Sequence, residues 1–93
     1  MRIYKYDLLI KDVRFQIKLP LGAKILTIQI QGGHPRLWAI VDETLEPTET
    51  RELLIIATGD QMPEVGRYIT TFQIHDGAFV WHVFEAPIKN LIS

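Results

Sequence analysis

The sequence contains no cysteine among its 93 residues and one serine, which is its final residue, Ser93. Without cysteine the chain has no disulfides, no thiolate zinc site and no thiol nucleophile. A serine at the very C-terminus is a poor nucleophile for Ser-His-Asp chemistry, which needs a hydroxyl held beside a histidine. We therefore expect a protein that is not an enzyme.

The chain also has no excess of charge and no long apolar run. Ten Lys and Arg face eleven Asp and Glu, for a net charge of −1. Proteins that bind duplex nucleic acid usually carry a basic excess, because neutralising phosphates supplies most of their affinity. The apolar runs are far shorter than the ~20 residues of a membrane span, and the polar start, Met1–Asp7, is not typical of a signal peptide. We expect a cytoplasmic protein that binds neither duplex nucleic acid nor membrane.

No segment has a helical spacing of apolar residues, and the strongest pattern is a two-residue alternation. In Val13–Leu19 every odd position is apolar and every even one is polar, which predicts a strand with one buried face. Leu26–Gln31 alternates in the same way with its even positions inward. Tyr4–Ile10 is predicted to be the first strand, and Lys11 and Asp12 to turn the chain into the second.

Later segments complete a set of about seven strands. Leu37–Val41 and Glu52–Ala57 are apolar almost throughout, so we expect both of their faces to be covered, by a second sheet or by another subunit. Tyr68–His75 and Phe79–Phe84 flank Asp76-Gly77, which is a strong hairpin signal. The pattern predicts an all-β fold, a small antiparallel sandwich or barrel.

Residues 1–93 are expected to form one domain with two less ordered parts. The polar, Thr-rich segment 42–52 is predicted to be a mobile surface loop. Residues 86–93 form a short C-terminal tail, either a helical turn or a packing arm. Small domains without disulfides often gain stability by oligomerising, and the apolar and aromatic residues exceed what a small core can cover. We therefore expect a homo-oligomer.

Candidate binding residues are aromatic, basic or placed where strands end. A strand that ends in Thr-Gly exposes backbone N–H groups that can hold a phosphate or carboxylate; alternatively, the glycine permits a bend and Asp60 caps a turn. Arginines at strand or loop ends can reach an anion, and surplus aromatic rings can stack on a flat ligand. The predicted ligand-binding residues are Arg36, Trp38, Thr58, Gly59, Arg67, Tyr68 and His82.

The histidines also raise the question of a metal site. His75 and His82 flank the Asp76-Gly77 turn, and with Asp76 or Glu85 they could form a metal site. Their spacing matches no zinc motif. The simpler interpretation is that one histidine is exposed at a strand end and the other lies on a sheet face. We expect no metal and no cofactor.

Five sequence blocks together carry a family resemblance. They are Gly22–Leu26, Leu37–Asp42, Thr58-Gly59, Tyr68–Thr71 and Val80–Glu85. In this order they resemble a family of short proteins encoded in phage and prophage genomes. The name of that family implies no activity. The resemblance implies a viral protein that acts in the cytoplasm of an infected bacterial host.

In an infected host, proteins called sponges sequester nucleotide immune signals. The predicted ligand-binding residues are similar in kind to those that such sponges use. Such proteins bind cyclic dinucleotides or cyclic ADP-ribose isomers between subunits without cleaving them. The resemblance therefore implies a non-enzymatic homo-oligomer that blocks host anti-phage defence. Two alternatives remain open. One is a protein-interaction module that inhibits a host defence protein through a sheet edge or apolar patch, and the other is a virion assembly accessory.

Overall fold

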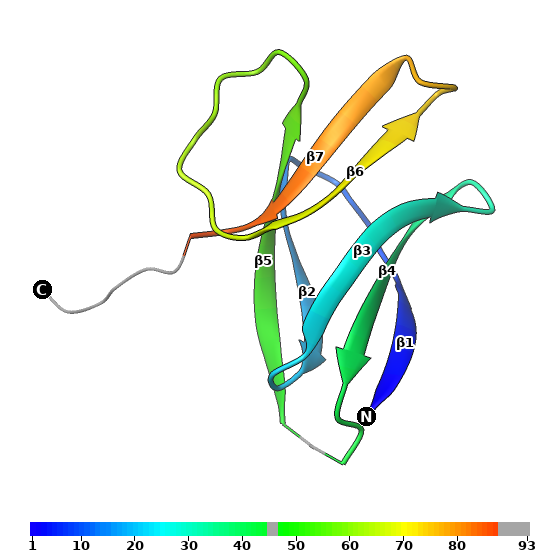
Figure 1. Ribbon diagram of the computed structural model, residues 1–93, viewed down its shortest axis with the longest axis vertical. Helices are drawn as coiled ribbons and strands as arrows, with labels where there is room; N and C mark the ends of the chain where they lie inside the picture. Colours follow the sequence, from blue (N-terminus) through cyan, green and yellow to red (C-terminus); the bar gives the residue numbers. More distant parts are fainter. Residues whose placement is uncertain (45–46, 88–93) are drawn as a thin grey trace, which may run out of the picture.

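The computed structural model describes residues 1–44 and 47–87, which form seven β-strands in two antiparallel sheets (Figure 1). Sheet A has the order β1-β4-β3 and sheet B the order β2-β5-β7-β6. The all-β antiparallel prediction is confirmed. Within the described residues no helix is long and apolar enough to cross a membrane. The strands are β1 (Arg2–Asp7), β2 (Arg14–Pro20), β3 (Lys24–Gln31), β4 (His34–Val41), β5 (Thr48–Ala57), β6 (Tyr68–Ile74) and β7 (Phe79–Glu85).

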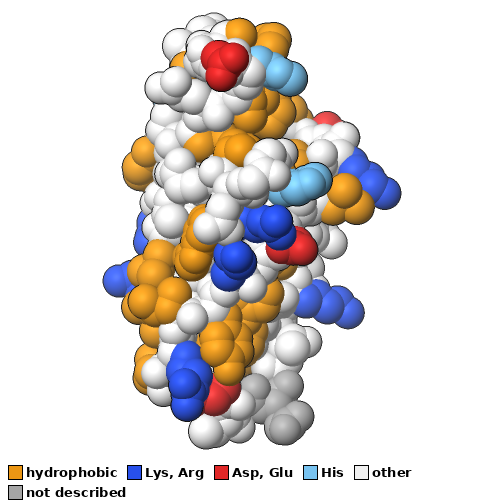
Figure 2. Space-filling model, turned by 90° about the vertical axis from the view of Figure 1, so that its right-hand side faces the viewer, with side chains coloured by type: hydrophobic (Ala, Val, Ile, Leu, Met, Phe, Trp, Pro, Cys, Tyr) orange, Lys and Arg blue, Asp and Glu red, His pale blue; other side chains and the backbone are white. Residues whose placement is uncertain are grey.

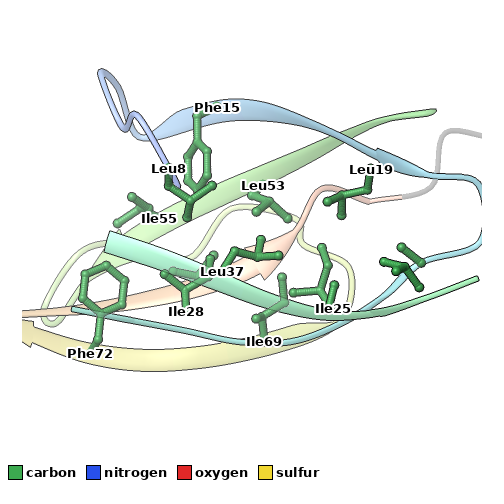
Figure 3. Packing of buried hydrophobic residues seen from close by; sticks show 14 residues of the cluster. Leu8, Phe15, Leu19, Ile25, Ile28, Leu37, Leu53, Ile55, Ile69 and Phe72 are labelled. Atoms are coloured by element: carbon green, nitrogen blue, oxygen red, sulfur yellow. The ribbon is translucent and has the colours of Figure 1, made fainter. Parts of the chain in front are cut away.

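The core lies between the two sheets, because alternate residues of each strand point to opposite faces. In β4, Leu37, Ala39 and Val41 are fully buried, and in β2 the inward positions are Phe15 and Leu19. Figure 3 shows side chains from both sheets pointing into the shared space. The alternation read from the sequence therefore sets the inner face of β2.

Sheets A and B meet along the edges of β3 and β6. The hydroxyl of Thr70 lies 2.9 Å from the hydroxyl of Thr27 and accepts from Nε2 of Gln29 at 3.0 Å. It also donates to the carbonyl of Ile28 at 3.3 Å. Side-chain hydrogen bonds therefore join these two edges, and β1 and β2 are the other two edges of the sandwich.

The beginning of the chain differs from the prediction. The first strand runs from Arg2 to Asp7 rather than from Tyr4 to Ile10, and Leu8 enters the core. Lys11 and Asp12 do lie between the first two strands. However, β1 pairs with β4 and β2 pairs with β5, so the connection carries the chain from one sheet to the other instead of closing a hairpin.

The second half of the polar segment 42–52 is strand, so the prediction of a loop is wrong for residues 48–52. Residues 48–52 belong to β5, where Thr50 pairs with Lys18 and Glu49 with Leu19. Threonine is a good strand former, and the polar residues sit on an exposed strand end. Residues 45–46 of the predicted mobile loop, and residues 88–93 of the predicted tail, lie outside the described residues.

A bulge changes which residues of β3 point inward. We expected Leu26, Ile28 and Ile30 to face the core, but the register shifts between Ile25 and Thr27. Ile28 is fully buried as expected. Ile25, before the shift, is fully buried in place of Leu26, and Leu26 and Ile30 are each 37% exposed. A bulge adds one residue to a strand and so reverses the side on which later residues lie.

The strand β5 is covered on both faces by its own chain. Leu53, Leu54, Ile55 and Ile56 are each at most 8% exposed. This confirms that both faces are covered and shows that no second subunit is needed there. The strand β4 is less enclosed, because its outward side chains, Trp38 among them, are half-buried.

Candidate functional site

The solvent-facing side of sheet A brings aromatic and basic side chains together. Because alternate residues of β4 are fully buried, Arg36 and Trp38 between them point outward. On β1, Lys5 pairs with Trp38 and Asp7 with Arg36. We call this surface the basic face, and it comprises Ile3, Lys5, Asp7, Lys24, Thr27, Gln29, Arg36, Trp38 and Ile40.

The basic face is more positive than the protein as a whole. It carries three cations, Lys5, Lys24 and Arg36, and one carboxylate, Asp7, which gives +2 against −1 for the whole chain. Arg36 pairs with Asp7, and Nζ of Lys5 donates to Oε1 of Gln31 at 2.9 Å. Figure 2 shows one side of the molecule on which basic, acidic and hydrophobic side chains lie close together. A local positive excess of this kind attracts small anions.

Arg36 has one donor that the protein does not use. Within the described residues, its Nε is a buried side-chain nitrogen without a hydrogen-bond partner. Leaving such a donor unsatisfied costs about 1–3 kcal/mol.

A row of hydrogen-bonded side chains crosses the outer face of sheet B. The hydroxyl of Tyr68 lies 2.7 Å from that of Thr71, which lies 2.9 Å from Nδ1 of His82. On the other side of the imidazole, Nε2 lies 2.8 Å from the hydroxyl of Thr58. The ring of Tyr68 also packs edge-on against Phe84, with the ring centroids 5.4 Å apart. We call Tyr68, Thr71, His82 and Thr58 the hydroxyl row.

The hydroxyl row holds its histidine from both sides. The hydroxyl of Thr58 lies 2.8 Å from Nε2 of His82 and 3.4 Å from the carbonyl of Val80. Nδ1 lies 2.9 Å from the hydroxyl of Thr71. Both ring nitrogens of His82 are thus engaged within the protein, and this row is a rigid surface rather than a set of open donors.

At the Thr58-Gly59 strand end, some of the backbone N–H groups that we expected to be free already donate within the protein. The amide of Thr58 donates to the carbonyl of Val80 at 3.1 Å, and the amide of Asp60 donates to the carbonyl of Ala57 at 3.0 Å. Gly59 has a φ of +96°, which favours glycine. The bend interpretation therefore describes this turn better than an anion site does.

Arg67 takes part in a contact between the sheets. Its Nη2 donates to the carbonyl of Ile25 at 2.7 Å, and its Nε lies 3.7 Å from Oε2 of Glu85. Arg51 also pairs with Glu85 and donates to the carbonyl of Ala23 at 2.6 Å. We call Arg51, Arg67 and Glu85 the sheet clamp, because two guanidinium groups beside sheet B bind carbonyl groups beside sheet A.

One end of the sandwich has a cavity of about 640 Å³ that the sequence reasoning missed. Trp81, Phe72 and Leu8 supply apolar lining, and His34 and His75 lie at its edge. It forms where three connections meet, which no local pattern reveals. The predicted Asp76-Gly77 turn is confirmed at this end, as a four-residue loop in which His75, Asp76 and Gly77 all have positive φ. The lining residues are Leu8, Leu9, Ile10, Ile30, Gly33, His34, Pro35, Phe72, Gln73, Ile74, His75, Asp76, Gly77 and Trp81.

Two ionisable groups outside these surfaces have perturbed pKa values. Burial, together with the neighbouring Tyr4, raises the pKa of Tyr6 on β1. Hydrogen bonds from the hydroxyl and the amide of Thr44 lower the pKa of Asp42. Neither group belongs to the basic face, whose positive charge comes from Lys5, Lys24 and Arg36.

The seven predicted binding residues thus fall on separate parts of the fold. Arg36 and Trp38 share the basic face, whereas the hydroxyl row on sheet B contains three others: Thr58, Tyr68 and His82. The sequence reasoning missed Lys5, whose place beside Trp38 depends on the pairing of β1 with β4. Among residues 1–44 and 47–87, no three His, Asp or Glu side chains gather as a metal site would require.

Comparison with known proteins adds a family. No curated protein and no solved structure matches the chain significantly. A family model described as a domain of unknown function, DUF7352, matches residues 1–91. Since this match covers nearly the whole chain, the protein belongs to the DUF7352 family.

Proposed function

We propose that the protein is a non-catalytic homo-oligomer that binds and withholds a nucleotide-type signal, a cyclic dinucleotide or a cyclic ADP-ribose isomer. The supporting observation is that Trp38 lies opposite Lys5 and two residues from Arg36, on the same outward face of sheet A. Indole rings stack on bases regardless of sequence, and guanidinium and ammonium groups bind phosphate oxygens. These are the groups that recognise a nucleotide.

The residue types on the basic face favour binding over turnover. Its carboxylate, Asp7, is paired with Arg36, and its other polar groups are Lys, Thr and Gln side chains. General acid–base catalysis needs a group of suitable pKa within hydrogen-bond reach of the reacting atom. The charged groups on this face are three cations and one paired carboxylate, which suits holding an anion.

The cellular setting is also part of the proposal. It rests on the five sequence blocks that in their order resemble phage and prophage proteins. A bacterial host that uses a nucleotide as an immune signal would be disarmed by a protein that lowers its free concentration. We therefore place the protein in the cytoplasm of the infected host.

Titration calorimetry tests the proposal directly. We expect cyclic di-GMP, cyclic di-AMP or a cyclic ADP-ribose isomer to bind and to be recovered chemically unchanged. Trp38→Ala and Arg36→Ala should each weaken binding at least about tenfold, which corresponds to ~1.4 kcal/mol. Tyr68→Ala, a matched aromatic truncation on sheet B, should bind normally. No binding across the panel at micromolar protein would refute the function, and steady conversion of a nucleotide would show an enzyme.

A second function is supported by the exposed edge of the sandwich. On β1, Ile3 is 61% and Tyr4 is 41% exposed, and an unpaired strand edge can accept a strand from another protein. A module that inhibits a host defence protein would use such an edge. A stoichiometric host protein in a pull-down from infected cells would favour this function, whereas a co-purified nucleotide would favour the first.

A further inference from the structure

The edge strand β1 exposes two large apolar side chains. Every residue in it except Tyr6 is exposed, with Ile3 at 61% and Tyr4 at 41%. By contrast, the apolar side chains of β5 are buried within the same chain. Long, exposed apolar strand edges tend to pair with another chain unless something protects them.

The backbone of β1 offers hydrogen-bonding groups on its outer side. The amide of Leu8 donates to the carbonyl of Pro35 at 3.2 Å, in register with the β1–β4 pairs. Hydrogen-bonded pairs alternate in an antiparallel ladder. Tyr4 and Tyr6 therefore bond to β4, whereas the backbone groups of Ile3 and Lys5 face away from it. Within residues 1–44 and 47–87, no strand pairs with that outer side.

Within the part of the chain that the structure describes, the other three edges have features opposing further pairing that β1 lacks. Side-chain hydrogen bonds around Thr70 join the edges of β3 and β6. The edge strands β1 and β2 both carry basic side chains, but β2 also ends with Pro20, which has no amide to donate. In contrast, β1 pairs with β4 without a bulge and contains no proline.

Symmetry restricts how two copies of β1 can pair. Residues opposite each other in a sheet lie on the same face, so a two-fold antiparallel pair must be centred on one residue. Centring on Lys5 would place two lysines directly opposite, which is destabilising. Centring on Tyr4 places Tyr4 opposite Tyr4, Arg2 opposite Tyr6, and Ile3 opposite Lys5 of the second copy.

The centre on Tyr4 is favourable on both faces of the strand. On the inner face, cross-strand tyrosines pack together and arginine lies against an aromatic ring. On the outer face, the stem of Lys5 can cover Ile3 of the second copy while its ammonium stays in water. The backbone groups of Ile3 and Lys5 then form hydrogen-bonded pairs.

We propose that two copies pair through β1 about an axis at Tyr4, and that the joined basic faces form one two-fold symmetric site. This rests on the proposed function and adds the interface and the symmetry of the ligand. Lys5 of each copy lies near the axis, and Trp38 lies one strand further out on each side. Three strand spacings separate the two Trp38 strands, about 14 Å. A cyclic dinucleotide, with two phosphates near its centre and two bases outside, has the matching symmetry.

Cysteine cross-linking tests the interface, and the chain has no cysteine of its own to interfere. At a central pair without hydrogen bonds the Cα atoms lie about 4.5 Å apart, within disulfide range. We expect Tyr4→Cys to form covalent dimers on mild oxidation at micromolar protein. Lys5→Cys, one residue from the axis, should not. Efficient cross-linking of Lys5→Cys, or of neither variant, would overturn the proposed register.

Size and stoichiometry test the shared site. An interface of one strand edge is small, so we expect reversible dimers in sedimentation of the unmodified protein. Tyr4→Glu places two carboxylates opposite each other and should yield monomers, whereas Phe79→Glu, a matched change at an exposed aromatic far along the fold, should still pair. Cyclic di-GMP or cyclic di-AMP should bind at one molecule per two chains.

The outcomes separate this inference from the proposed function. Nucleotide binding at one per chain by a monomer would overturn the inference and leave the proposed function intact. Tyr4-centred dimers that bind no nucleotide would refute the function and the shared site while establishing the interface. Pairing of β1 with a host protein instead of a second copy would overturn the inference.

Discussion

Thr70 lies where the edges of β3 and β6 meet, and it is buried with its hydroxyl engaged. The hydroxyl of Thr70 contacts the hydroxyl of Thr27, the side-chain amide of Gln29 and the backbone carbonyl of Ile28. Thr70→Val keeps the shape but removes all three hydrogen bonds, so we expect a loss of about 1–3 kcal/mol in the free energy of unfolding. Urea denaturation measures this loss. Thr50→Val, at an exposed position of β5, should change stability by less than about 0.5 kcal/mol; equal losses would contradict the role of Thr70.

Asp42 shows how a local turn changes an ionisable group just after β4. Its carboxylate accepts from the hydroxyl of Thr44 at 2.6 Å and from the amide at 3.1 Å, which lowers its pKa from 3.8. Because the folded pKa is lower than the unfolded one, this stabilisation is present above pH 3.8 and is lost as the pH falls through the folded value. We expect an NMR titration to show this lowered pKa. Thr44→Val should return it towards 3.8, and Thr50→Val should leave it unchanged; a carboxyl indifferent to Thr44→Val would disprove the cause.

At the scale of elements, the sheet clamp ties β5 and β7 to β3. Glu85 pairs with Arg51 and Arg67, whose guanidinium groups reach the carbonyls of Ala23 and Ile25. Glu85→Gln removes the charge between two cations that are partly withdrawn from water, and we expect a loss of about 1–2 kcal/mol. Thermal unfolding at low salt would measure it. A matched change, Glu64→Gln on the exposed loop before β6, should have little effect, and a similar loss there would argue against the clamp.

Strand positions were largely readable from the sequence because alternation records which face is buried. The segments around Phe15 and Phe72, and the Asp76-Gly77 turn, lie where the pattern placed them. Pairing was not readable. The connection at Lys11 and Asp12 joins two sheets, and the bulge at Leu26 shifts a register, because both depend on partners distant in sequence. Polar threonines were likewise mistaken for loop residues, although an exposed strand end accepts them.

The same limits applied to the prediction of the candidate site. Arg36 and Trp38 were found from residue type and lie two apart on one strand, so local spacing was enough to place them on one face. Lys5 was missed because strand pairing alone brings it opposite Trp38. Arg67 was expected to bind an anion, but its guanidinium contacts Glu85 and the carbonyl of Ile25. Residue chemistry therefore identified the kind of group, and tertiary pairing decided which groups share a surface.

For the whole molecule, charge is divided unevenly. The basic face carries +2 while the chain carries −1, so the remainder carries −3, the difference between the two. Pairing through β1 would place two such faces side by side and raise the local positive potential. A dianionic ligand lowers that potential, and ligand binding should therefore favour the paired state.

Stability of the whole molecule should then depend on protein concentration. Anything that binds the folded state alone stabilises it by mass action, and a second copy is such a ligand. Once most chains are paired, a tenfold rise in concentration adds about 0.7 kcal/mol per chain, which raises the Tm of a domain of this size by about 3–6 °C. Differential scanning calorimetry over a hundredfold range should show this rise for the unmodified protein and for Phe79→Glu, and none for Tyr4→Glu. A Tm that is independent of concentration in all three would mean that the chain unfolds as a monomer, and that the exposed edge of β1 serves another partner.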